Sequence, residues 1–188
     1  MKVLFGIIIY FLPSFSGICQ NIPTGTEVIL RFINEIGGKK KLMKVRTIIL
    51  EVEGTYHDIK FHRKSYTIAP DRIKIIQKTH FLENIDIMND GKYQHTENGE
   101  IKEMDEETRL WLEDEVKTFP QLYYLEDGSK LKNMGEKDYE KGYYEVEVTL
   151  IDGRRKIQYY SIETGLLWKT IDAKTKSSFY YWEYDTFK

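Results

Sequence analysis

The fold class is decided by residues 143–150, which read YYEVEVTL. The apolar side chains of this stretch fall on one side of an extended chain: Tyr144, Val146, Val148 and Leu150. The alternate positions carry Glu145, Glu147 and Thr149 and fall on the other side. A strand with one dry and one wet face is typical of an antiparallel sheet that covers a core on one side only.

The same period of two recurs along the chain, more weakly, in residues 45–53, 59–68, 71–79, 81–88, 154–161, 166–171 and 177–185. Three turn sequences separate neighbouring strands: Asn89-Asp90-Gly91, Asn98-Gly99 and Asp152-Gly153. Such short connections predict antiparallel neighbours, because parallel strands need long crossovers. The 14 Tyr, 9 Phe and 3 Trp also favour strands.

Two helices interrupt this pattern. Residues 26–36 carry one apolar stripe, with Thr24 or Thr26 as the N-cap and Gly37-Gly38 as the stop. Residues 104–117 form a second, acidic helix that ends at Phe119-Pro120. Residues 128–142 are polar, and we expect a loop with a short strand there. The expected fold is mainly β (α+β): an antiparallel curved sheet or incomplete β-barrel, covered by an N-terminal helix and one inserted helix.

The first 19 residues have the pattern of a cleavable signal peptide. Lys2 precedes the apolar residues 3–12, and small residues follow before Cys19. We therefore expect residues 1–19 to be removed, leaving residues 20–188 as a single periplasmic or secreted domain. A lipid anchor on Cys19 is disfavoured, because the bulky Ile18 stands where lipoprotein signals carry a small residue.

Composition excludes several partners of the mature chain. Without Lys2 it has 27 basic and 30 acidic residues, a net charge of about −3, so nothing favours nucleic acid. Removal of Cys19, the single cysteine, leaves no disulfide. About 169 residues suffice for one domain with one core.

Several segments resemble a known family. Residues 27–42 read EVILRFINEIGGKKKL, and residues 45–48 begin the first strand. Further matches are the hairpin at residues 89–92, the acidic helix after it, and residues 143–150 leading through Asp152-Gly153 to residues 159–167. Together they resemble the outer-membrane lipoprotein-sorting proteins (LolA-like) of Bacteroidetes-type bacteria, over most of the mature chain. None of these motifs is catalytic.

The resemblance implies an incomplete barrel, closed on one side by helices, whose apolar concave face holds acyl chains of lipoproteins or lipid. The candidate residues of this wall are Ile48, Leu50, Val52, Tyr144, Val146, Val148, Leu150, Ile157 and Tyr159. The alternative is that they form an ordinary core beneath the two helices. Relatives usually continue beyond residues 179–185 with further strands, so we expect a shorter or more open barrel here. Either its exposed sheet edge is covered by an envelope protein or by self-association, or the chain is a truncated relative with reduced function.

The sequence indicates a non-enzymatic protein without a cofactor or metal. The four histidines are scattered, and neither an H-E-x-x-H nor a G-x-S-x-G motif is present. The leading function is a carrier or chaperone for acyl chains. The second is a protein-binding module with an aromatic C-terminal surface formed by Trp168, Tyr180, Tyr181, Trp182 and Tyr184. A hydrolase with an unrecognised site is the third.

Overall fold

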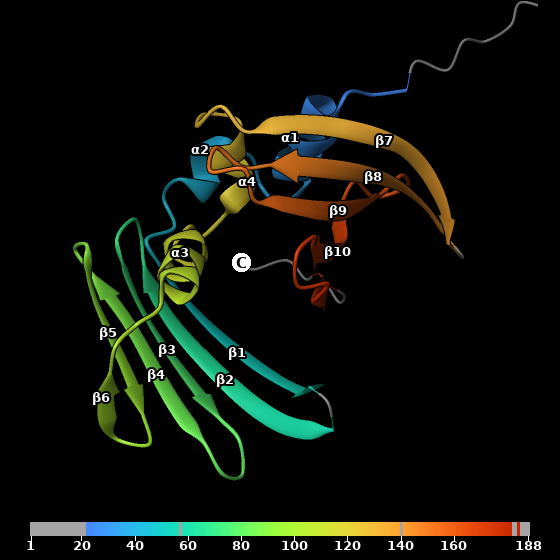
Figure 1. Ribbon diagram of the computed structural model, residues 1–188. Helices are drawn as coiled ribbons and strands as arrows, with labels where there is room; N and C mark the ends of the chain where they lie inside the picture. Colours follow the sequence, from blue (N-terminus) through green and yellow to red (C-terminus); the bar gives the residue numbers. More distant parts are fainter. Residues whose placement is uncertain (1–21, 57, 140, 182–183, 185–188) are drawn as a thin grey trace, which may run out of the picture.

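The computed structural model of the chain describes residues 22–56, 58–139, 141–181 and 184. The predicted signal peptide, Cys19 and Trp182 lie outside these residues. The described part forms two antiparallel sheets (Figure 1). The first sheet has the strand order β1-β2-β3-β4-β5-β6, and the second has the order β11-β10-β9-β8-β7. The mainly β prediction is confirmed, with two sheets that are not closed into a barrel among the described residues.

The first half of the chain supplies α1 (Gly25–Glu35), α2 (Lys39–Leu42), β1 (Thr47–Tyr56), β2 (Ile59–Ile68), β3 (Arg72–Lys78), β4 (Glu83–Asn89), β5 (Lys92–Glu97) and β6 (Glu100–Lys102). The second half supplies α3 (Glu106–Glu115), α4 (Pro120–Tyr124), β7 (Lys130–Tyr139), β8 (Lys141–Thr149), β9 (Arg155–Ser161), β10 (Leu167–Asp172) and β11 (Ser178–Tyr180). Both predicted helices are present. The predicted hairpin turns are confirmed by positive φ angles at Asp90 (49°) and Asn98 (47°) and at the glycine after each.

Helix α1 begins at a reciprocal cap. The Glu27 N–H donates to Thr24 Oγ1 at 3.2 Å, and the Thr24 N–H donates to Glu27 Oε2 at 2.7 Å. The hydrogen bond from the Thr24 backbone lowers the pKa of Glu27, so this carboxylate is charged at neutral pH. Gly25 allows the start of α1 to approach β7, because a Cβ there would lie 2.8 Å from the carbonyl carbon of Leu131.

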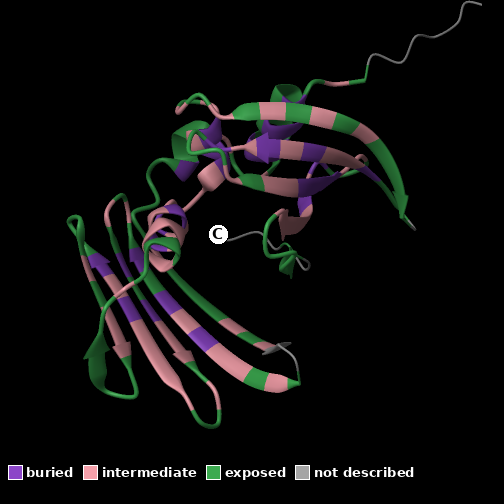
Figure 2. Ribbon diagram, viewed as in Figure 1, coloured by how far each residue is buried: buried purple, intermediate pink, exposed green. Residues whose placement is uncertain are grey.

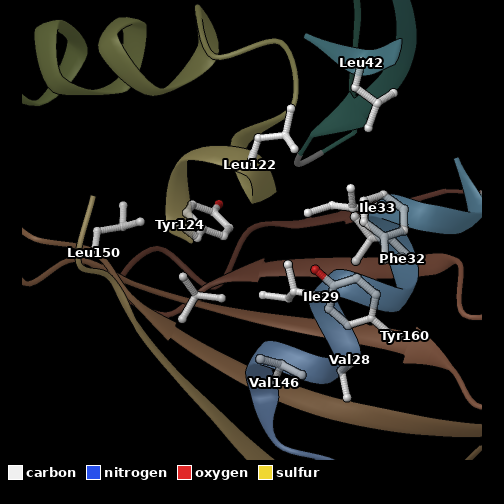
Figure 3. Close-up of a cluster of buried hydrophobic side chains, with 12 residues drawn as sticks. Val28, Ile29, Phe32, Ile33, Leu42, Leu122, Tyr124, Val146, Leu150 and Tyr160 are labelled. Carbon is white, nitrogen blue, oxygen red and sulfur yellow. The ribbon is translucent and has the colours of Figure 1, made fainter. Parts of the chain in front are cut away.

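The apolar stripe of α1 packs on β8 and forms the larger core (Figure 3). Ile29 and Ile33 are essentially inaccessible to solvent, as are Val146 and Val148 opposite them. The cluster consists of Val28, Ile29, Phe32, Ile33, Leu42, Leu122, Tyr124, Val146, Val148, Leu150, Tyr160 and Leu167. Helices α1, α2 and α4 therefore fill one face of the second sheet.

Two elements differ from the prediction. Helix α3 ends before Phe119-Pro120, as predicted, but Pro120 is the first residue of a further short helix, α4, where the missing N–H of proline costs no hydrogen bond. Residues 128–142 contain β7, a strand of ten residues and not a short one. Its apolar signal is weak because β7 is an edge strand, interrupted by a register shift between Asn133 and Glu136.

We expect Ile29→Ala to lower the free energy of unfolding by about 2–5 kcal/mol, because it leaves a cavity in the larger core. The neighbouring Leu30 is 43% exposed on the same helix, and Leu30→Ala should change stability by less than about 0.5 kcal/mol. Urea unfolding of both variants, followed by circular dichroism, tests this assignment. Equal losses would contradict the orientation of α1.

Candidate functional site

Helix α3 covers one face of the first sheet, which we call the inner face (Figure 2). Leu112 and Val116 of the α3 segment pack on Ile73, Ile75 and Met88 from β3 and β4. Cross-strand pairing fixes the other residues of this face, since directly opposed residues lie on the same side of a sheet. Ser65 of β2, opposite Ile75, is on the inner face and is buried.

A buried arginine attaches α3 to the inner face. Arg63 of β2 is only 8% exposed, and its guanidinium carbon lies 4.8 Å from the ring centroid of Trp111. Its Nη2 group also forms an ion pair with Glu115. The Nε atom of Arg63 is buried and has no hydrogen-bond partner. Charge therefore contributes to the attachment of α3 alongside the small apolar contact.

A buried carboxylate attaches α3 to the second sheet. Asp114 is 8% exposed, and its Oδ2 atom lies 3.0 Å from Arg154 Nη1 and 3.1 Å from Lys156 Nζ. Lys156 pairs with Val148 across the strands, so it lies on the face that α1 covers. Arg154 Nη1 also approaches the Leu110 carbonyl oxygen at 3.3 Å. Helix α3 is thus bonded to both sheets.

The predicted wall residues of β1 lie on the inner face and remain partly uncovered. Ile48, Leu50 and Val52 pair with Thr67, Ser65 and Arg63 of β2. Leu50 is 47% exposed although its neighbour Ser65 is buried. The half-buried Phe61 extends this row, because its ring lies over Gly54, where a Cβ would be 2.7 Å from the ring. We call Ile48, Leu50, Val52 and Phe61 the apolar strip.

The other predicted wall residues do not join this strip. Four of them face α1 and its neighbours: Tyr144, Val146, Val148 and Leu150. This is the arrangement expected if they form an ordinary core. Tyr159 pairs with Glu145 and Ile157 pairs with Glu147, so these two residues lie on the opposite face of the second sheet. The prediction that all nine residues form a single wall is therefore wrong. The error arose because pairing decides whether two strands share a face, and a strand's own alternation does not.

The polar residues of the inner face were not among the predicted site residues. Arg63, Ser65 and Thr67 are all buried on β2, and His95 Nδ1 lies 2.7 Å from Asp86 Oδ1 on β4. The period-two alternation of residues 59–68 could have indicated the first three, because Arg63, Ser65 and Thr67 share one face of β2 and are its buried positions. Among the described residues, no group of three His, Cys, Asp or Glu side chains could hold a metal ion.

An aromatic cluster lies on the outer face of the second sheet, opposite α1. Trp168 stacks on Tyr143 with ring centroids 4.4 Å apart and an interplanar angle of 23°. Tyr139 and Tyr180 flank Trp168 at 5.4 and 5.6 Å, and burial raises the pKa of Tyr159 beneath them. The predicted aromatic surface is thus only partly correct. Trp168 is half-buried among its neighbours, whereas Tyr180, Tyr181 and Tyr184 are exposed. Tyr184 also donates a hydrogen bond to the Leu167 carbonyl oxygen at 2.7 Å.

A pocket of about 490 Å³ lies away from the inner face, between the start of α1 and the turn after β9. Its lining includes Glu27, Arg31, Tyr144 and Gly165. The Arg31 guanidinium is already engaged, donating to the carbonyl oxygens of Ile162 and Glu163 at 2.8 Å each. Two N–H groups of Arg31 are therefore already used by backbone carbonyl oxygens at this pocket.

We expect Asp114→Asn to destabilise the protein by about 2 kcal/mol or more, because Arg154 and Lys156 would lose their shared counter-charge. Glu107→Gln is the matched control, since it removes an exposed α3 carboxylate that pairs with Lys174 at 2.8 Å. Thermal unfolding of the two variants should show a large loss for the first and little change for the second. The reverse order would refute the role assigned to Asp114.

Neither the length of the described helices nor a comparison with known proteins adds a functional residue to this geometry. The described part of the chain has no helix with both the length and the apolar character needed to cross a membrane. No family model matches the chain, and no curated protein matches it. The similarity to lipoprotein-sorting proteins therefore stays a prediction based on the motifs quoted above.

Proposed function

We propose that this protein is a non-enzymatic carrier of acyl chains, either of free lipid or of lipoproteins, acting in the periplasm or outside the cell after removal of residues 1–19. One observation carries the proposal. The apolar strip lies on the inner face beside α3, and Leu50 is left 47% exposed within it. Hydrocarbon laid along the strip would gain roughly 0.8 kcal/mol for each methylene removed from water.

The strip is long enough to contact part of an extended acyl chain. Ile48 and Val52 are four residues apart on β1, which corresponds to roughly 14 Å along a strand. Phe61 closes one end over Gly54. Displacement of α3 would enlarge the apolar surface, because Ile73, Ile75 and Met88 lie beneath Leu112 and Val116. The polar contacts of Arg63 and Asp114 would have to break in that event.

The proposal predicts that Leu50→Asp weakens binding of a fluorescent fatty acid at least about tenfold, because a carboxylate would be brought against hydrocarbon. Ile49→Asp is the matched control. Ile49 is 61% exposed on the same strand but lies on the opposite face, so this variant should bind normally. Fluorescence titration measures both affinities, and circular dichroism confirms that both variants fold. Equal binding by the two variants would exclude the strip as the site.

Native mass spectrometry of the protein purified gently from a bacterial envelope gives an independent test. A stoichiometric acyl-bearing species, lost in Leu50→Asp, is the expected result. An empty protein together with unimpaired probe binding by Leu50→Asp would remove the support for a carrier.

A second candidate function is favoured by the aromatic cluster, which suits a protein-binding module of the cell envelope. Tyr139 and Tyr180 are exposed at its rim, and Lys169 Nζ lies 4.7 Å from the Tyr180 ring centroid. Aromatic side chains surrounded by such a rim dominate many interfaces. Crosslinking in an envelope extract followed by capture should recover a partner with wild type but not with Tyr139→Ala/Tyr180→Ala. Recovery of the same species with Leu50→Asp would separate this surface from the apolar strip.

A further inference from the structure

The free edge of β1 differs from the other sheet edges. The edge strands β6 and β11 are only three residues long. The edge strand β7 is long, but it carries several lysines and a register shift next to Gly135, whose φ is 100°. Short strands, lysines and bulges are the usual means by which proteins prevent strand pairing at an edge.

Strand β1 is neither short nor bulged, and its charged residues are two glutamates, Glu51 and Glu53. It is ten residues long, reads TIILEVEGTY and contains no lysine, arginine or proline. Its register with β2 runs without a shift from the Thr47–Ile68 pair to the Tyr56–Ile59 pair. Ile49 and Leu50 are exposed on its two faces. Among the described residues, β1 is therefore a regular edge with β2 as its one neighbouring strand.

The hydrogen-bonding pattern shows which backbone groups are available. The Ala69 N–H donates to the Arg46 carbonyl oxygen at 2.9 Å, which continues the register of β1 and β2. Bonded and non-bonded pairs alternate in an antiparallel ladder, so even-numbered residues of β1 bond to β2. The odd-numbered residues Thr47, Ile49, Glu51 and Glu53 direct their N–H and C=O groups away from β2. None of the described backbone groups bonds to them there.

The carboxylates on β1 indicate which kind of strand would fit this edge. Glu51 and Glu53 lie on the outer face, opposite Lys64 and His62 of β2. The hydrogen bond with His62 lowers the pKa of Glu51, with Lys64 contributing, so this carboxylate is charged at neutral pH. A strand added beyond β1 would place its own side chains on the other side of these carboxylates. Cations there would complete a row of alternating charge.

We propose that the edge of β1 binds an extended segment of another protein, in which basic residues alternate with apolar residues. The segment adds a strand to the first sheet. Its backbone bonds to Thr47, Ile49, Glu51 and Glu53, and its basic side chains meet Glu51 and Glu53 on the outer face. Its apolar side chains continue the apolar strip on the inner face. This recognition by strand addition goes beyond acyl-chain binding and does not depend on it.

The probe is a labelled ten-residue peptide of alternating Lys and Val with blocked ends, titrated by fluorescence anisotropy. Saturable binding by the wild type is expected, with weaker binding of the matching Glu and Val peptide. Hydrogen exchange adds a direct readout: bound peptide should protect the amides of residues 47, 49, 51 and 53, while those of 48, 50 and 52 are already protected.

Two sets of variants sharpen the test. Ile49→Pro removes an N–H that points away from β2, so it should weaken binding about tenfold or more and leave the β1–β2 ladder intact. The control Ile49→Thr keeps the N–H and should bind within a few-fold of wild type. Glu51→Lys/Glu53→Lys should reverse the preference toward the Glu and Val peptide.

Three results would overturn the proposal: no saturable binding, equal binding by Ile49→Pro and wild type, or an unchanged preference in the charge-reversed variant. Sedimentation velocity without peptide tests whether a second copy of this chain occupies the edge instead. A dimer that Ile49→Pro dissociates would show that a second copy fills the edge, and the proposal would then be wrong. Ile49→Pro should still bind the fluorescent fatty acid, so failure here is distinguishable from failure of the carrier proposal.

Discussion

The relative placement of the two sheets depends on the Asp114 carboxylate. Asp114 stands on α3, which packs on the first sheet, and it binds Arg154 and Lys156 of the second sheet. A buried carboxylate is costly unless several cations or donors surround it. This requirement explains why two cations from one end of the second sheet converge on a single side chain. This contact joins α3 to the second sheet together with the hydrogen bond of Arg154 to Leu110 and the ion pair of Glu107 with Lys174.

The two sheets use their helices in different ways. Helix α1 fills its face of the second sheet with hydrocarbon, and little of that surface remains for a ligand. Helix α3 covers the first sheet with a few apolar residues and several charged ones, and it leaves Leu50 partly uncovered at the β1 edge. The place most open to hydrocarbon is consequently β1, one of the edge strands. Both proposals concern that strand, one through its inner face and the other through its backbone.

Local patterns in the sequence were sufficient for most elements of the fold. The stripe of α1, the glycine turns and the alternation of residues 143–150 each act within a few residues, and all are found in the structure. Pairing acts over longer distances, and this is where prediction failed. Ile157 and Tyr159 alternate correctly within β9, but the register with β8 places them opposite Glu147 and Glu145. Nor could the sequence alone reveal that Arg63 would be buried against Trp111, because those residues are brought together by the docking of α3.

The contrast between the helices gives the molecule two separate physical controls. Contacts such as those of Ile29 with the second sheet weaken on cooling, because the hydrophobic driving force fades at low temperature. The exposed pair of Glu107 of α3 and Lys174 responds instead to ionic strength, because dissolved ions screen exposed charges. The buried contacts of Arg63 and Asp114 are screened much less. Cooling and salt therefore act on different helices of the same chain, and a rise in ionic strength that weakens the exposed contacts of α3 need not disturb α1.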